Sequence, residues 1–198
     1  MTTKPLLGPF VHVNYSQPDY LTKAAKIAVR DGGNTFMLYS PITTLRHDFH
    51  APVNLPSFHK YCHRKHINPD SLVLHAPFMI NLANPVDVKV WHFSLDFLKE
   101  QLIYCDRIGF KYLVLHPGSH LATTRERGLN RLVMGLNRLH LNRYHTQVVL
   151  ETMSGKGSEL GNKFKDFAYI LKRVNHPEKI GICLDTCHMN DAGYDLGH

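Results

Sequence analysis

Gly181-Ile-Cys-Leu-Asp-Thr-Cys-His188 is a short apolar run that ends in a carboxylate, a thiol and an imidazole. A run of this length is typical of a buried β-strand, with the polar residues at the mouth of the strand. Asp185 and His188 are three positions apart, so they can serve one metal ion or two adjacent ions. Three earlier apolar segments end in a similar way, and this repetition is the main evidence for the fold.

Short apolar strands alternate with helical segments along the chain. Strands are predicted at residues 6–13, 34–39, 71–75, 111–116, 147–151 and 180–184, and helices at 20–29, 57–65, 91–108, 125–143 and 164–174. Ser57 is the predicted N-cap of the second helix. The alternation predicts parallel βαβ units, and strands that are apolar on both faces predict a sheet buried on both sides.

Two architectures are compatible with this pattern, a doubly wound sheet and a TIM-type (β/α)8 barrel. Polar residues at the carboxyl ends of several different strands favour the barrel, because barrel active sites are built there. The sequence contains about six strand–helix units, whereas a closed barrel needs eight. We therefore expect an α/β fold of the TIM-barrel type, as a single domain over residues 1–198 that is incomplete at its C-terminal side.

The polar strand ends form a candidate metal site. His75 ends the third predicted strand, His116 the fourth, Glu151 the fifth, and Asp185 with His188 the sixth. Successive parallel strands bring these ends to one rim, where imidazole and carboxylate ligands suit zinc or manganese. A carboxylate such as Glu151 can bridge two ions that face one phosphate, an arrangement suited to phosphodiester cleavage. Each residue alone is more often structural, but five at four consecutive strand ends favour metal binding.

Two loops after these strands are rich in small residues: His116-Pro-Gly-Ser-His120 and Glu151-Thr-Met-Ser-Gly-Lys-Gly-Ser-Glu-Leu-Gly161. Their backbone amides can receive phosphate oxygens, with Ser119 in the first loop and Lys156 as a point charge in the second. Such loops are also common as simple turns. Cys183 and Cys187 flank Asp185, and we interpret them as small buried packing residues rather than as ligands.

Composition narrows the class of protein. Lys and Arg number 23 against 16 Asp and Glu, which gives a net charge of +7. A pI near 9.3 favours polyanions such as nucleic acid as binding partners, although a role of the charge in solubility alone is equally compatible with it.

The 15 histidines are dispersed, and the 4 cysteines lack the spacing of a disulfide framework. Without an apolar leader or a long apolar span, we expect an intracellular protein, cytoplasmic or in the DNA compartment, with no membrane partner.

The sequence resembles the endonuclease IV family of apurinic/apyrimidinic (AP) endonucleases. The segments that carry the resemblance are Leu74-His75 with Ile80-Asn81-Leu82, Leu115-His-Pro-Gly-Ser-His120, Leu150-Glu151 with Gly155-Lys-Gly-Ser-Glu-Leu-Gly161, and 181–188 with Ala192-Gly-Tyr-Asp-Leu196. The resemblance implies a TIM barrel with three zinc ions. It also implies cleavage of double-stranded DNA on the 5′ side of abasic sites, the endonuclease step of base excision repair.

Roles for individual residues follow from the same resemblance. His75 and His116 look like ligands of the first zinc, Glu151 like the bridging and catalytic carboxylate, Asp185 like a ligand of the second zinc and His188 like a ligand of the third. Ser119 and Lys156, in the two loops that can receive phosphate oxygens, are candidate DNA contacts.

Phe78 lies where the family has an aromatic residue that wedges into the DNA stack, the alternative being a core aromatic. The loop from Tyr39 to Arg46 departs from the family because it lacks an Asn-Gln-Arg pattern, and Arg46 is a candidate DNA-inserting residue there. The family's further ligands, a His, an Asp-x-His pair and a Glu from strands seven and eight, would lie beyond His198. We therefore expect reduced or no nuclease activity from the isolated chain, or a second chain that completes the barrel.

Two other functions are compatible with the same residues. A metal-dependent sugar isomerase or epimerase shares the barrel and the strand-end metal site, but needs neither a basic surface nor an aromatic wedge. A non-catalytic DNA-binding remnant would keep only some of the ligands.

Overall fold

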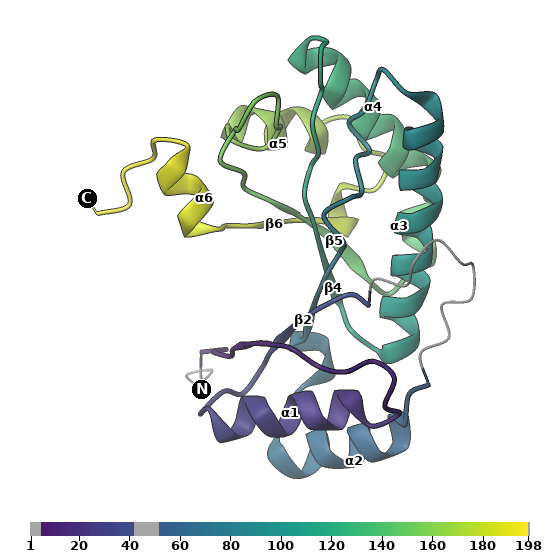
Figure 1. Cartoon of the computed structure of the whole chain (residues 1–198), viewed down its shortest axis with the longest axis vertical. Helices are drawn as coiled ribbons and strands as arrows, with labels where there is room; N and C mark the ends of the chain where they lie inside the picture. The colour runs from purple at the N-terminus through teal and green to yellow at the C-terminus, as the bar shows by residue number, and fades with distance from the viewer. Residues whose placement is uncertain (1–4, 42–51, 198) are drawn as a thin grey trace.

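Six short strands form one parallel sheet in a computed structural model that describes residues 5–41 and 52–197 (Figure 1). The strands are Phe10–Val11 (β1), Met37–Tyr39 (β2), Val73–His75 (β3), Tyr112–Leu115 (β4), Gln147–Glu151 (β5) and Ile180–Cys183 (β6). The α-helices are Tyr20–Arg30 (α1), Leu55–Lys65 (α2), Val88–Ile108 (α3), Arg125–Arg138 (α4), Phe164–Leu171 (α5) and Thr186–Asp191 (α6). Each strand pairs with the next one in sequence, as in part of a TIM-barrel wall, which confirms the predicted fold class.

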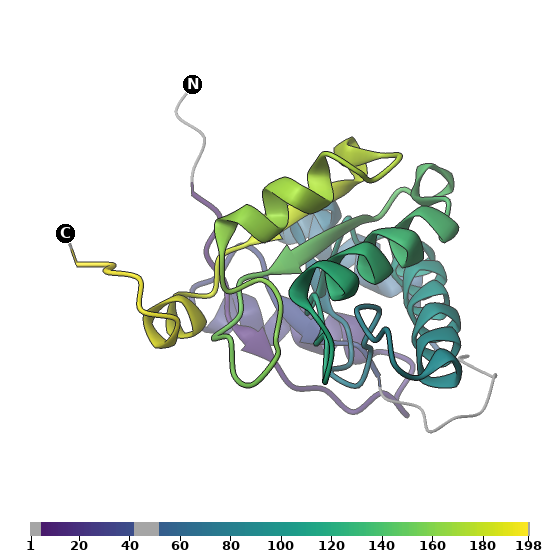
Figure 2. The ribbon, with the colours of Figure 1, turned by 90° about the horizontal axis from the view of Figure 1, so that it is seen from above.

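The two faces of the sheet carry different side chains. Leu38, Leu74 and Leu113 point to the face packed against the helices, and each is 0% exposed. Helices α3, α4 and α5 follow one another around this side (Figure 2). Tyr39 and His75 are register partners and point to the opposite face. The parallel register therefore places the polar strand ends on one rim.

The first strand is much shorter than predicted, two residues instead of 6–13. Pro9 has no N–H to donate to a sheet, so regular pairing starts only at Phe10. Gly8 passes very close to the next segment, since a Cβ there would lie 1.8 Å from the Thr35 carbonyl oxygen.

Helix α2 does not begin at the predicted N-cap, Ser57. Asn54 is the N-cap, and its side-chain oxygen accepts a hydrogen bond from the Ser57 amide at 3.2 Å. Pro56 fits the first turn because its missing N–H would have no helical partner there. The helix predicted over 125–143 also ends earlier, at Arg138, because His140 adopts a left-handed conformation with φ 50°.

A short helix that the sequence analysis missed, α6, follows the last strand. Asp185 is its N-cap, and the carboxylate accepts a hydrogen bond from the His188 amide at 2.8 Å. His188 therefore lies in a helix and not at the end of a strand, which corrects the prediction.

The last strand, β6, is an edge of the described sheet. Ile182 is 40% exposed and Leu184 is 58% exposed. By contrast, Leu38, Leu74 and Leu113 on the inner strands are buried beneath the helices. An exposed apolar edge strand is a site for pairing with another segment. A second chain that completes the barrel therefore stays a prediction, with this edge as its expected docking place.

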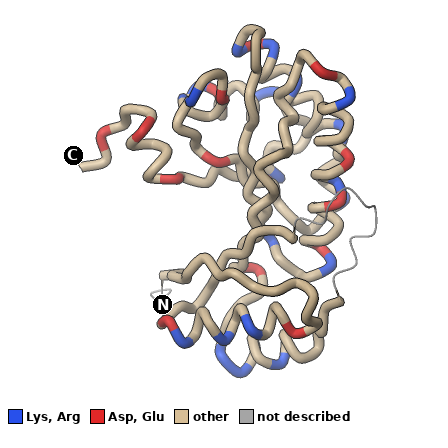
Figure 3. The backbone as a smooth tube through the Cα atoms, viewed as in Figure 1, with Lys and Arg blue, Asp and Glu red and all other residues tan. Residues whose placement is uncertain are grey.

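Charge is unevenly distributed over the molecule. Lys and Arg are numerous on α1 and α2, whereas Asp residues lie along α6 and the segment after it (Figure 3). Across the described ranges, no helix has both the length and the apolar character needed to span a bilayer.

Candidate metal centre

Three side chains from neighbouring strands converge at one rim of the sheet. His75 ends β3, His116 directly follows β4, and Glu151 ends β5. Glu151 Oε2 lies 3.0 Å from His75 Nε2 and 3.2 Å from His116 Nε2. Glu151 is only 5% exposed, so its carboxylate is held away from bulk water.

The His75 ring presents a defined nitrogen to this cluster. Its Nδ1 lies 2.8 Å from the Ala76 carbonyl oxygen, which can only accept a hydrogen bond. Nδ1 therefore carries a proton, and Nε2 is the ring nitrogen directed at Glu151 Oε2, 3.0 Å away, where it would meet a metal ion. A hydrogen bond of this kind is the usual way in which a protein fixes the tautomer of a metal-binding histidine.

The carboxyl of Glu151 is strongly favoured in its charged form. Burial raises its pKa, but hydrogen bonds and positive charge from His116 and His75 outweigh burial and hold the pKa well below its usual range. The carboxylate is therefore available as a ligand at neutral pH.

The donor set fits a zinc ion. Two ligand atoms of one tetrahedral zinc lie roughly 3.3 Å apart, given zinc–ligand bonds of about 2.0–2.1 Å. The separations of 3.0 and 3.2 Å between the two Nε2 atoms and Glu151 Oε2 are close to this value. Two imidazoles and a carboxylate are also common zinc ligands.

A second group of possible ligands shares Glu151 and adds Asp185 and His188. His188 Nδ1 lies 3.3 Å from Glu151 Oε1 and 3.6 Å from Asp185 Oδ2. All five predicted metal ligands thus lie in one continuous cluster, with Glu151 between its two halves.

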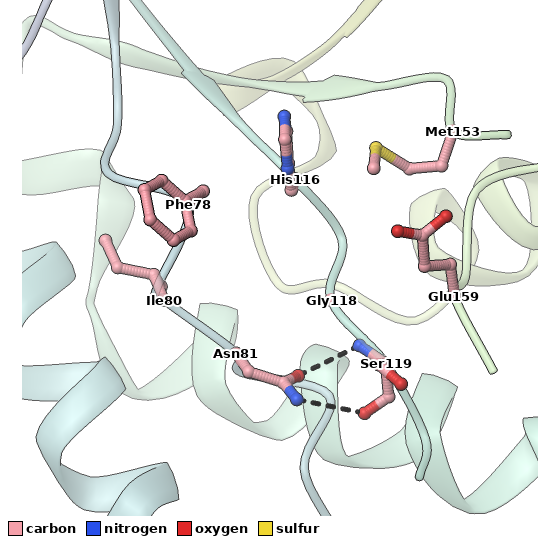
Figure 4. A pocket seen from close by; sticks show the side chains of 8 residues that line it. All are labelled: Phe78, Ile80, Asn81, His116, Gly118, Ser119, Met153 and Glu159. Atoms are coloured by element: carbon pink, nitrogen blue, oxygen red, sulfur yellow. Dashed lines mark hydrogen bonds between the residues drawn. The ribbon is translucent and has the colours of Figure 1, made fainter. Parts of the chain in front are cut away.

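A small pocket of about 140 Å³ adjoins the cluster (Figure 4). Its lining residues are Phe78, Ile80, Asn81, His116, Gly118, Ser119, Met153 and Glu159. Phe78 is 75% exposed, so it is not the core aromatic of the alternative interpretation. Ser119 also lines the pocket, as expected of a residue near the site. Arg46 lies outside the described residues.

Some backbone amides of the loop that contains Lys156 already donate hydrogen bonds to other protein groups. The Lys156 side chain is exposed, but its amide donates to Glu159 Oε2 at 2.9 Å. The Leu160 amide donates to the Gly118 carbonyl at 2.9 Å, which ties this loop to the one after β4. Several of the amides expected to receive phosphate are therefore already bonded, while the ammonium group of Lys156 remains exposed.

Asn81 connects the loops after β3 and β4. Its Oδ1 accepts from the amides of Ser119 at 3.0 Å and Ala83 at 3.1 Å, and its Nδ2 donates to the Ser119 carbonyl at 3.1 Å. Gly118 allows this close approach, since a Cβ there would lie 2.3 Å from Asn81 Oδ1. Asn81 therefore holds together the two loops that carry Phe78 and Ser119.

Replacing Asn81 with Ala is expected to lower the free energy of unfolding by about 1–3 kcal/mol, because two backbone amides lose their acceptor. Asn81→Asp keeps an acceptor oxygen and should lower it less. Urea denaturation followed by circular dichroism measures both changes. An Ala variant as stable as the unmodified protein would contradict the role of these bonds.

The two cysteines beside Asp185 are not buried packing residues as predicted. Cys183 is half-buried and Cys187 is exposed. Both are accessible because α6 leads away from the sheet and leaves this edge uncovered (Figure 1). Burial, with the nearby charges of Glu151 and Asp185, raises the pKa of the Cys183 thiol to about 11.

Iodoacetamide should therefore alkylate Cys183 slowly in the metal-free protein. With a pKa of about 11, roughly one Cys183 in a thousand is a thiolate at pH 8. We expect peptide mass spectrometry to find Cys187 modified first, and the rate at Cys183 to rise about tenfold per pH unit. Equal rates at the two cysteines at pH 8 would contradict the raised pKa.

Comparison with known proteins assigns the chain to a family. A family model described as a xylose isomerase-like TIM barrel matches residues 25–196. A relative from Mesoplasma florum named probable endonuclease 4 is 41% identical over 98% of this chain and 68% of its own length. The chain belongs to the endonuclease IV family. A Bacillus subtilis relative of the same name is 36% identical over 93% of this chain, which covers 62% of that protein.

The fold of this endonuclease IV family member also matches solved structures. Endonuclease IV from Thermus thermophilus gives a TM-score of 0.73 at 21% identity, over 97% of this chain and 67% of that chain. An L-ribulose 3-epimerase gives 0.71 at 16% identity, over 96% of this chain and 64% of that chain. At these identities the matches show the fold alone. The chain spans about two thirds of the length of these proteins.

Two residues at the centre had no role in the sequence analysis. Asn81 stood inside one of the segments that resemble the endonuclease IV family, so a signal for it existed. Thr152 contacts residues 183–188, more than 30 positions away, and nothing in the sequence pointed to it.

Proposed function

We propose that the protein is a zinc-dependent AP endonuclease that acts in DNA base excision repair and cleaves double-stranded DNA on the 5′ side of abasic sites. The observation that carries the proposal is the approach of His75 Nε2 and His116 Nε2 to Glu151 Oε2, at 3.0 and 3.2 Å, at the rim of a parallel sheet. Membership of the endonuclease IV family supports the reaction class.

The residues have separate tasks in this proposal. His75 and His116 would hold one zinc through Nε2, Glu151 would be shared with a neighbouring zinc, and Asp185 and His188 would hold the rest of the metal. Zinc at this position would act as a Lewis acid, which stabilises negative charge on a phosphodiester and lowers the pKa of a bound water molecule. Ser119 and the Lys156 ammonium contact the DNA backbone, and Phe78 fills the gap left by the missing base.

A sugar epimerase is the alternative that shares this fold. The epimerase match is at 16% identity, whereas the relatives named probable endonuclease 4 reach 41%. The net charge of +7 and the exposed ring of Phe78 suit a nucleic acid better than a small polyol.

The test uses the zinc-loaded 198-residue chain, in excess over a labelled duplex that contains one tetrahydrofuran abasic residue. We expect a nick on the 5′ side of that residue, none in the undamaged duplex, and a linear fall of log affinity with log salt. Binding and single-turnover nicking are measured separately, so that slow nicking is distinguished from weak binding. Conversion of a ketohexose without preference for the abasic duplex would favour the epimerase.

Phe78→Ala should weaken binding of the abasic duplex by about 5- to 150-fold, the range for losing one aromatic stacking contact. The free energy of unfolding should hardly change, because the side chain is 75% exposed. Phe164→Ala is the matched control, since Phe164 is an aromatic on α5 that is 47% exposed. Fluorescence anisotropy measures the affinities, and an equal effect of the two changes would exclude a specific role for Phe78.

A further inference from the structure

Thr152 directly follows Glu151 and directs its polar atoms at one distant segment. Its amide donates to the Cys183 carbonyl at 2.9 Å, and its hydroxyl accepts from the Asp185 amide at 2.8 Å. Its carbonyl oxygen lies 3.0 Å from His188 Nδ1. Thr152 is 3% exposed, so water does not compete effectively for these bonds.

The carbonyl of Thr152 decides which nitrogen of His188 can bind a metal. A carbonyl oxygen has no proton to donate, so Nδ1 must carry the hydrogen of this bond. Nδ1 is also the ring nitrogen that lies 3.3 Å from Glu151 Oε1. The free lone pair is therefore on Nε2, and His188 does not offer a ligand atom through the nitrogen beside Glu151.

The hydroxyl of Thr152 acts on Asp185. The hydroxyl oxygen accepts a hydrogen bond from the Asp185 amide. Asp185 is also the N-cap of α6, and its Oδ1 accepts a hydrogen bond from the His188 amide at 2.8 Å. Asp185 Oδ1 is thereby occupied, which leaves Oδ2 for a metal ion. A chain of hydrogen bonds thus runs from Thr152 to Asp185 to His188.

We propose that Thr152 is the positioning residue of the second half of the metal centre, holding Asp185 and His188 so that they present Oδ2 and Nε2 to separate ions. The inference rests on the proposed zinc centre, but it concerns metal binding and does not depend on the DNA substrate. Partners that orient ligands in this way are commonly worth about 10–100-fold in metal affinity.

The test compares three variants by zinc titration against a chromophoric chelator. Thr152→Val removes the hydroxyl at nearly constant shape and should weaken zinc binding about 10–100-fold at the sites with Asp185 and His188. The site of His75 and His116 should be unchanged, and Thr152→Ser should restore the affinity. Thr22→Val is the matched control, because the Thr22 hydroxyl is buried without a hydrogen-bond partner in the described part of the chain.

Nitrogen-15 NMR of the metal-free, unmodified protein gives a second measurement that needs no variant. We expect His188 to carry its proton on Nδ1. Unchanged zinc affinity in Thr152→Val, or a proton on Nε2 of His188, would overturn the proposal. If Thr152→Val does not fold, Thr152→Ala is titrated instead with the same expected loss. Absence of DNA nicking would count against the proposed function alone, since both measurements are independent of DNA.

Discussion

Replacing Glu151 with Gln is expected to lower the rate of nicking of abasic duplex DNA by more than about 100-fold while leaving affinity for that DNA nearly unchanged. Loss of a partner outside the ligand set already costs about 10–100-fold in activity, and Glu151 touches both halves of the cluster directly. The amide has almost the same shape but no negative charge, so it cannot bridge two cations. The proposed DNA contacts, Phe78 in the loop after β3 and Lys156 farther along the loop after β5, do not depend on this charge and should remain in place.

Single-turnover nicking and fluorescence anisotropy on the same duplex separate the two effects. Glu126→Gln, the same change at an exposed position in the first turn of α4, is the control and should alter neither. Circular dichroism shows whether each variant is folded. Parallel loss of binding and nicking in Glu151→Gln would instead indicate that Glu151 supports the structure of the site.

Metal removal is expected to have the second large effect. Dialysis against EDTA should abolish nicking, and zinc should restore it, because the only dense set of imidazole and carboxylate ligands found among the described residues surrounds Glu151. His116→Ala should reduce the number of zinc ions bound and prevent the recovery. The physical reason is that His116 Nε2 and His75 Nε2 are the two imidazole nitrogens that face Glu151 Oε2.

Metal analysis after equilibrium dialysis measures the zinc content directly. His145→Ala is the control. His145 is an exposed histidine beside Asp70 and precedes the start of β5, whereas Glu151 lies at the end of that strand, so its loss should leave the zinc content unchanged. Three zinc ions per chain would support a complete centre. One or none would support a binding remnant, and nicking that persists in EDTA would contradict the proposed reaction.

Much of the site was predictable because it depends on strand ends. His75, His116 and Glu151 each follow an apolar run, and a parallel sheet necessarily brings such positions to one rim. The same reasoning placed His188 at the end of the sixth strand, whereas it lies in the short helix α6. The sequence after Asp185 contains no long periodic pattern, and the short helix that holds His188 forms because Asp185 caps it.

The sequence by itself determined the strand–helix alternation, the parallel sheet and the candidate ligands at the strand ends, since these depend on local apolar periodicity and on the residue types next to it. The resemblance of its motifs indicated the family. Only the tertiary structure decided which ring nitrogens of His75 and His188 contact a backbone carbonyl, that Asn81 joins two loops and that Thr152 holds Asp185 and His188. Those features depend on hydrogen bonds between residues far apart in the chain. Such bonds have directions and distances, which a pattern of residue types does not contain.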